Sequence, residues 1–307
     1  MYSLEDIMKS PPKHARTIFF HHTTCARDKN GTVTFTARQA CSIESAAKLN
    51  INQDVFVLFA AQVGSLSNNP TSPIFKALTS YPNIYLRSVN WYNYAIHTPA
   101  QEWVKRDIIL TSPYYVAHLS DFIRLVTLYK YGGIHFDLDF IIQKSLDDMP
   151  ANFAGAEQSD VISNAVFGIE SNYIGHKIIE MILREHTQYY KPRELLPHGS
   201  GSITRVMQKI CHRKKTLEMM PEFCWGFKVF PERTFFPIPR WSWRQYFDTN
   251  ATALNETLHQ IKESVAVHFW NSFSQYRNVM KSEPRNVYRF LAEQFCPKVF
   301  QASGPYF

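Results

Sequence analysis

The chain has 307 residues, 45% of them hydrophobic and only 19% charged, which provides enough apolar material for a sizeable core and excludes wholesale disorder. The formal net charge of +7 suits an anionic ligand such as a nucleotide diphosphate, or an anionic membrane surface, although a merely basic surface also explains it. No basic stripe with interleaved aromatic residues is present, so nucleic acid is not an expected partner.

Strands and helices alternate along the first part of the chain. Residues 1–16 contain a Pro-Pro pair and little periodicity, and we expect them to form a stem or linker. Apolar runs at 17–20, 54–59 and 83–89 are typical of buried strands, and helical spacing over 38–49 places a helix between the first two. This order predicts βαβ units, and therefore an α/β fold with a mostly parallel sheet.

A long helix and a strand follow in direct succession. Apolar residues at spacings of three and four predict a helix over 113–131, which Gly132-Gly133 ends. Residues 134–142 then predict a strand. The remaining predicted elements are strands at 153–157, 164–170 and 264–270, and helices at 173–190, 202–214 and after Pro284.

Three N-glycosylation sequons, at Asn30, Asn250 and Asn255, lie in polar segments and favour the secretory route. A transmembrane helix needs about 20 continuous apolar residues, and the sequence has no such run. The first six residues do not resemble a signal peptide. We therefore expect a secretory protein whose anchor or signal is not visible in this sequence.

The five cysteines allow two short disulfide loops. Cys25 lies close to Cys41 in the sequence, and Cys211 lies close to Cys224, so each pair is a plausible disulfide and Cys296 is left over. The alternative is a set of five reduced cysteines in the core of a cytosolic protein. No Cys-x-x-Cys pair is present, so a structural zinc site is not expected.

Two carboxylates in the strand predicted at 134–142 carry the strongest chemical signal. Alternate residues of a strand share a face, so we expect Asp137 and Asp139 on one face with His135, while the residues between them face the core. Two adjacent carboxylates repel each other unless a cation is bound, and oxygen ligands of this kind suit Mn²⁺ or Mg²⁺. Such a cation would hold a pyrophosphate and neutralise its charge.

Asp121 and Arg124 lie three residues apart on the helix predicted just before this strand, so they share a face. Arg124 is suited to bind a phosphate or a sugar hydroxyl, and Asp121 to accept hydrogen bonds from hydroxyl groups. Taken alone, the pair is better explained by an intrahelical salt bridge.

The order of these features is more specific than any one of them. Ser-Asp-x-x-Arg at 120–124, a helix ended by Tyr-Gly-Gly, and then Asp-x-Asp resemble the Asp-x-Asp sugar-transfer region of the α-1,4-glycosyltransferases. The likeness covers nearly all of the chain from about Thr17 onward and includes five further segments, 17–20, 40–47, 164–167, 234–239 with Trp243, and 267–271. It implies a single GT-A-type domain, with the nucleotide-sugar-binding region at 17–170 and the acceptor-side region at 171–307.

The resemblance also implies roles for the matching residues. Asp137 and Asp139 would bind the metal, with His268 as a late metal ligand; on spacing alone, His268 is better explained as a core histidine. The implied catalytic residues are Asp121, Arg124 and Asp139. The implied donor contacts are Asp121, Arg124, Asp137, Asn164, Gly199 and Trp270.

Gly199 belongs to a glycine-rich segment, 198–202, that we expect to form a turn before the helix at 202–214. The family has Gly-Pro in this turn, whereas this chain has Gly-Ser. A turn that opens a helix presents backbone N–H groups to an anion or a sugar oxygen.

The implied activity is transfer of galactose, or of an N-acetylhexosamine, from a UDP-sugar to a glycolipid or glycan, with retention and formation of an α-1,4 linkage. Mn²⁺ is the expected cofactor, Mg²⁺ the alternative, and the Golgi the expected compartment. UDP-galactose with a lactosylceramide-like acceptor is the leading expectation, and membrane association would come through the acceptor or through an anchor before the stem. The alternatives are a metal-dependent phosphohydrolase, a catalytically inactive glycan-binding relative and a purely structural α/β domain.

Overall fold

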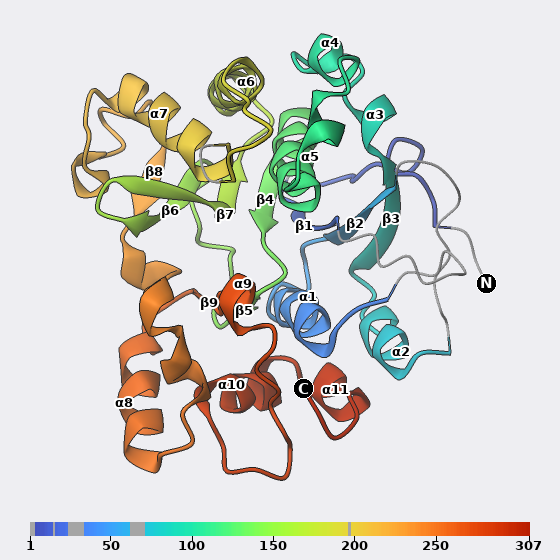
Figure 1. The fold of residues 1–307 in the computed structure, drawn as a ribbon, viewed down its shortest axis with the longest axis vertical. Coiled ribbons are helices and arrows are strands. Elements are labelled where there is room, and N and C mark those ends of the chain that lie inside the picture. Colours follow the sequence, from blue (N-terminus) through green and yellow to red (C-terminus); the bar gives the residue numbers. More distant parts are fainter. Residues whose placement is uncertain (1–3, 15, 24–33, 62–70, 196–197) are drawn as a thin grey trace.

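A seven-stranded sheet in the order β3-β2-β1-β4-β7-β6-β8 forms the centre of the protein (Figure 1). The computed structural model describes residues 4–14, 16–23, 34–61, 71–195 and 198–307. The strands of this sheet are β1 (Ile18–His22), β2 (Val55–Ala61), β3 (Ile84–Asn90), β4 (Gly133–Phe136), β6 (Phe153–Gln158), β7 (Val161–Ile169) and β8 (Lys228–Phe230). Only β7 runs antiparallel to its neighbours, so the predicted α/β class with a mostly parallel sheet is confirmed.

Helices cover both faces of the sheet. On one face lie α1 (Ala37–Leu49), α2 (Pro73–Thr79), α8 (Ala251–Ile261), α10 (Val287–Phe295) and α11 (Pro297–Ala302). On the other lie α3 (Trp91–Tyr94), α4 (Gln101–Val104), α5 (Tyr115–Tyr131), α6 (Tyr173–Gln188) and α7 (Gly199–Cys211). Short 3-10 helices span Ile108–Thr111, Thr216–Glu218, Glu232–Thr234 and Arg240–Phe247.

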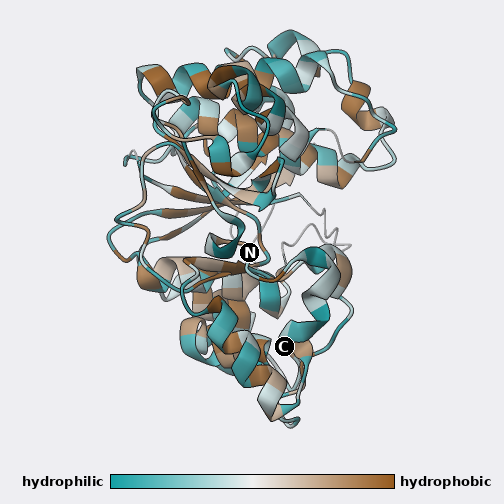
Figure 2. Cartoon of the chain, turned by 90° about the vertical axis from the view of Figure 1, so that its left-hand side faces the viewer, coloured by the Kyte–Doolittle hydropathy of each residue, from teal (hydrophilic) through white to brown (hydrophobic). Residues whose placement is uncertain are grey.

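The alternation of side chains in β1 explains why its sequence is continuously apolar. Ile18 and Phe20 enter the core on the α1 side, whereas Phe19 enters the core on the α5 side. A parallel sheet that is buried on both faces requires apolar residues at every position of its central strands. Figure 2 shows this difference: the central strands are largely hydrophobic, whereas the surrounding helices mix hydrophobic and hydrophilic segments.

The prediction of one continuous strand over 134–142 is wrong in the middle of that range. β4 ends at Phe136, the chain turns through Asp137–Asp139, and it resumes as β5 (Phe140–Ile142). β5 belongs to a separate two-stranded sheet, in which it pairs antiparallel with β9 (Ala266–His268). The two aspartates are therefore brought together by a turn between two sheets, and not by the alternation of side chains along one strand.

The disulfide predicted between Cys25 and Cys41 is also wrong. Cys41 is bonded to Cys296, with 5.0 Å between the two Cα atoms, because α1 packs against α10 and α11; Cys25 lies outside the described residues. The predicted Cys211–Cys224 disulfide is confirmed. Since the Cys41–Cys296 bond closes almost the whole chain into a loop, it restrains the unfolded state by about 5 kcal/mol on the chain-entropy estimate.

Glu44 makes a second connection between α1 and α11. Its buried carboxylate accepts hydrogen bonds from the backbone N–H groups of Lys298 (2.9 Å) and Val299 (2.7 Å) and from the Tyr81 hydroxyl (2.6 Å). These two N–H groups belong to the first turn of α11, where a helix has no internal acceptor for them. Glu44 thus caps a helix from far along the chain.

We expect Glu44→Gln to lower the free energy of unfolding by about 2–3 kcal/mol. The substitution removes the charge that strengthens these hydrogen bonds, and it points the amide NH₂, itself a donor, at a buried group that also donates. Urea unfolding of the disulfide-bonded protein measures the difference. Glu222→Gln, at an exposed position, is the matched control and is expected to leave the unfolding midpoint unchanged. Equal midpoints for the two variants would contradict a capping role for Glu44.

The segment expected as a stem contacts the sheet. Ser88 of β3 accepts a hydrogen bond from the Ile7 backbone N–H and donates one to the Glu5 carbonyl, and the Ile7 side chain is fully buried. Of the three sequon asparagines, Asn250 caps the start of α8 and Asn255 lies on it, and both are exposed; Asn30 lies outside the described residues. No helix in the described part of the chain is long and apolar enough to span a bilayer.

Candidate active site

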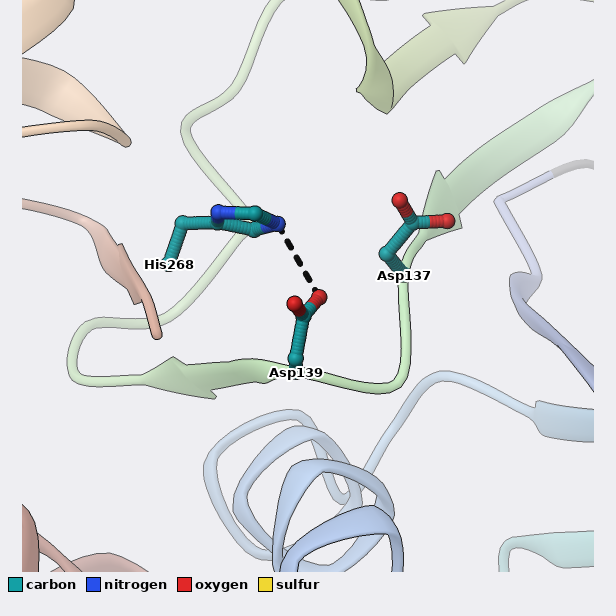
Figure 3. Close-up of side chains that lie close together, drawn as sticks. All are labelled: Asp137, Asp139 and His268. Carbon is teal, nitrogen blue, oxygen red and sulfur yellow. Dashed lines mark ion pairs between the residues drawn. The ribbon is translucent and has the colours of Figure 1, made fainter. Parts of the chain in front are cut away.

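The turn Asp137–Asp139 lies just past the carboxyl end of β4, the edge at which ligands bind in open α/β sheets. Pairing of β5 with β9 sets His268 opposite Phe140, and therefore beside Asp139. Figure 3 shows the two aspartates and His268 converging from this turn and from β9. Their possible ligand atoms all lie within 4.8 Å of one another.

Both oxygens of Asp139 are held in place. Oδ1 lies 3.0 Å from Nε2 of His268, and Oδ2 accepts a hydrogen bond of 2.8 Å from the backbone N–H of Asn271, the first residue of α9 (Asn271–Ser274). Trp270 adopts the left-handed conformation (φ 53°, ψ 53°), which is rare for a bulky residue. This strained backbone directs the Asn271 N–H at Asp139, and strain of this kind is concentrated at functional sites.

Arg124 is a buried cation on α5 that connects three parts of the site. Its Nη1 lies 2.8 Å from Oδ1 of Asp137 and donates to the Asn164 carbonyl at 2.9 Å. Its Nη2 lies 3.6 Å from Oδ1 of Asp121 and donates to the Ser120 hydroxyl at 2.6 Å. The predicted pairing of Arg124 with Asp121 is thus only one of its contacts, and the contact with Asp137 is shorter.

The amino terminus of α7 closes one side of the site. Asn164 of β7 donates from Nδ2 to Oδ1 of Asp121 at 2.6 Å and accepts at Oδ1 from the Ser200 hydroxyl at 3.0 Å. The prediction of a glycine-rich turn over 198–202 is wrong, because the helix already begins at Gly199. A side chain at position 199 would meet Asn164, so its absence lets the helix approach this closely.

The charge around His268 differs from that around an ordinary core histidine. Burial disfavours its imidazolium, but Asp139, by charge and by hydrogen bond, and then Asp137 raise the net pKa of His268 above its ordinary value. Nδ1 of His268 is buried and has no hydrogen-bond partner among the described residues, so the ring has one polar contact, and that contact is to a carboxylate. A histidine that serves only the core would not need this arrangement.

The predicted residues form two groups that share Asp137. One comprises Asp137, Asp139 and His268; the other, joined by hydrogen bonds or close approach, comprises Asp121, Arg124, Asp137, Asn164 and Gly199. The remaining prediction, Trp270, is only 6% exposed: its ring packs against His268 with 4.3 Å between centroids, and its indole N–H donates to the Ile238 carbonyl.

Sequence reasoning missed Ser200 and Asn271. Ser200 reaches Asn164 only because α7 begins earlier than predicted. Asn271 acts through its backbone N–H, which depends on the conformation of Trp270 and leaves no signal in side-chain chemistry. The position of Asn271 directly after the His-Phe-Trp segment was the one available sign.

Two family descriptions match the chain, each over less than half of its length. The glycosyltransferase sugar-binding region containing the DXD motif matches residues 36–155, and the alpha 1,4-glycosyltransferase conserved region matches residues 171–303. The first of these ranges contains the Asp137–Asp139 turn and the second contains His268.

Similar proteins include lactosylceramide 4-alpha-galactosyltransferase of Homo sapiens, which is 28% identical over 301 residues, or 97% of this chain and 81% of the relative. Alpha-1,4-N-acetylglucosaminyltransferase of Homo sapiens is 24% identical over 264 residues, or 85% of this chain and 75% of the relative. Among solved structures, galactosyltransferase LgtC in complex with donor and acceptor sugar analogs is 13% identical, with a TM-score of 0.41 over 94% of this chain and 96% of that one. The chain is therefore a glycosyltransferase, which matches the DXD-containing sugar-binding region in its first part and the alpha 1,4-glycosyltransferase conserved region in its second.

Proposed function

We propose that this chain transfers galactose from UDP-galactose to a terminal sugar of a glycolipid or glycan, forming an α-1,4 linkage in the Golgi. The observation that carries the proposal is the convergence of Asp137, Asp139 and His268 beside the buried Arg124. The galactose donor and a lactosylceramide-like acceptor are supported by the likeness to lactosylceramide 4-alpha-galactosyltransferase. A Golgi location agrees with the two exposed sequon asparagines, Asn250 and Asn255.

The donor atoms of the site fit a divalent cation. Two ligands about 2.1 Å from one ion lie about 3–4 Å apart, so the observed spread of up to 4.8 Å needs only a small inward movement. Two carboxylates and one imidazole suit Mn²⁺, and Mg²⁺ is the alternative. When bound, the cation would neutralise charge on the diphosphate of the donor.

The residues around this group would bind and orient the donor. Asp137 is 30% exposed at its side chain and Asp139 only 12%, so Asp137 is the more open of the two to an incoming ligand. Asp121, fixed by Asn164 and Arg124, presents its carboxylate to sugar hydroxyl groups. The buried Arg124 contributes a fixed positive charge close to where the nucleotide leaves, and a preorganised charge of this kind lowers the barrier.

An α-linked product from an α-linked donor requires retention at the anomeric carbon. We propose attack by the acceptor hydroxyl on the face from which UDP departs, with positioning and electrostatics supplying most of the rate. The proton NMR coupling at the anomeric position of the product reports its configuration. A β-linked product would refute retention without affecting the assignment of the site.

The experiment that tests the proposal is a donor screen. Purified protein with Mn²⁺ receives each of UDP-galactose, UDP-N-acetylgalactosamine and UDP-N-acetylglucosamine, and UDP release is measured with and without lactosylceramide or a soluble β-galactoside. We expect release that depends on UDP-galactose, on the metal and on the acceptor, and that stops when the metal is chelated.

Each other outcome has a definite meaning. Acceptor-dependent release from a UDP-N-acetylhexosamine would replace galactose as the donor, in line with the likeness to alpha-1,4-N-acetylglucosaminyltransferase. UMP or phosphate release without an acceptor would identify a phosphohydrolase. No release from any donor, with UDP binding also absent, would favour a catalytically inactive glycan-binding relative.

A further inference from the structure

A chain of four buried polar side chains leads from the α5 side of the sheet to Asp137. The Tyr94 hydroxyl lies 3.1 Å from Oγ1 of Thr127, which lies 2.9 Å from Nε2 of His21. Nδ1 of His21 lies 3.0 Å from Nδ1 of His135, and Nε2 of His135 lies 3.1 Å from Oδ1 of Asp137. Thr127 and His135 are fully buried, and His21 and Tyr94 are nearly so.

The Asp137 carboxylate, at one end of this series of hydrogen bonds, fixes the direction of each of them. The carboxylate of Asp137 can only accept, so His135 must carry its proton on Nε2 and leave Nδ1 bare. His21 must then donate from Nδ1, which leaves its Nε2 to accept from the Thr127 hydroxyl. The Thr127 oxygen in turn accepts from the hydroxyl of Tyr94.

The surroundings support this arrangement of neutral rings. Burial, the neighbouring His135 ring and Arg124 hold the pKa of His21 well below its ordinary value. Burial raises the pKa of Tyr94, so that its hydroxyl remains a donor. Each neutral imidazole then has one donor nitrogen and one acceptor nitrogen, and each nitrogen has one partner of the opposite kind within this series of hydrogen bonds.

The consequence is the orientation of the Asp137 carboxylate. Its Oδ1 accepts from both His135 and Arg124, whereas Oδ2 has no donor among the described residues. We propose that His135, whose Nε2–H tautomer is supported by the hydrogen bonds of His21 and Thr127 on the far side of its ring, is a positioning residue that holds Asp137 so that Oδ2 faces the cation and the donor diphosphate. This inference rests on the proposed function, since it takes Asp137 as a metal ligand.

The first test reads the tautomers directly in the metal-free protein. Long-range proton–nitrogen NMR of protein labelled with ¹⁵N-histidine distinguishes Nε2–H from Nδ1–H rings, and variants at His21 and His135 assign the signals. We expect His135 as the Nε2–H tautomer and His21 as the Nδ1–H tautomer. The reverse tautomer at His135 would overturn the inference, and this result would stand whether or not the donor screen finds a transferase.

The second test measures Mn²⁺ binding in the presence of UDP by calorimetry. His135→Leu removes the donor and is expected to raise the dissociation constant about 10–100-fold, the range known for partners of metal ligands. His135→Gln keeps an N–H that reaches the same oxygen, and we expect it to restore binding to within about threefold of the original. Equal affinity of His135→Leu and the unchanged protein would overturn the positioning role.

Thr127 offers a remote probe if His135→Leu does not fold. Thr127→Val removes only the hydroxyl, and Thr127→Ser is the matched control that keeps it. We expect Thr127→Val to shift the His21 and His135 nitrogen signals and to weaken Mn²⁺ binding, and Thr127→Ser to do neither. Identical spectra and identical affinities for the two variants would show that the tautomer of His135 does not depend on Thr127.

Discussion

Asp139→Asn is expected to lower kcat/KM for sugar transfer by at least about 10³-fold while the protein stays folded. The substitution removes the charge that faces His268 and Asp137, and replaces one carboxylate oxygen by an amide that cannot bind a cation. The fold should survive because an asparagine oxygen can still accept the Asn271 N–H, the contact that fixes α9 to the turn. Initial rates with the donor found by the screen, together with calorimetric titration of Mn²⁺, measure the loss.

Asp148→Asn is the matched control for this variant. It makes the same chemical change at an exposed carboxylate in the same stretch of chain, and we expect full activity from it. Thermal unfolding of both variants separates loss of chemistry from loss of fold. If Asp139→Asn transferred sugar at the original rate, with unchanged dependence on the metal, Asp139 would not be a metal ligand.

The central strands β1 and β2 were predictable from the sequence because they are buried on both faces. The runs at 17–20, 54–59 and 83–89 correspond to β1, β2 and β3, and each observed strand differs from its prediction by at most two residues at either end. The helix at 113–131 corresponds to α5, which ends as predicted before Gly132-Gly133. In both cases burial leaves a local pattern that can be recognised without knowledge of the neighbouring elements.

The turn at Asp137–Asp139 was not predictable from the same kind of pattern. Phe136 and Phe140 flank the aspartates and are both buried, as alternation in one strand requires. They belong instead to strands of two different sheets, and the pairing partners that separate them, β7 and β9, are distant in the sequence. A period of two cannot distinguish one strand from two strands joined by a turn.

Contacts between segments that are distant in the sequence were the least predictable features. Pairing of Cys41 with Cys296 and capping of α11 by Glu44 both follow from the packing of α1 on the end of the chain. His268 meets Asp139 only because β9 pairs with β5, and on spacing alone it resembled a core histidine. The family resemblance suggested His268 as a ligand, but neither composition nor periodicity did.

Gly199 shows how a backbone position can control the site without any side chain. A Cβ at this position would lie 1.9 Å from Nδ2 of Asn164 and 2.7 Å from Oδ1 of Asp121, both far inside contact distance. The obstructing atoms are the ends of side chains, so an alanine can be accommodated if Asn164 swings away. That movement breaks the 2.6 Å hydrogen bond that fixes the Asp121 carboxylate.

We therefore expect Gly199→Ala to reduce kcat/KM about 10²-fold, the effect of a displacement of about 1 Å at a positioning contact. Stability should change little, because alanine favours the first turn of α7 by up to about 1 kcal/mol over glycine and so offsets the lost hydrogen bond. Gly304→Ala, where a Cβ meets open space, is the control and should be fully active.

A double variant distinguishes a steric cause from any other. In Asn164→Ala the obstructing amide is absent, so adding Gly199→Ala should reduce kcat/KM much less than it does in the original protein. The effects of the two substitutions on kcat/KM should therefore fall well short of additive. Full additivity would mean that position 199 acts independently of Asn164, for instance by presenting its backbone N–H to the donor. Unchanged activity of Gly199→Ala alone would show that the close approach of α7 to Asp121 is not needed for transfer.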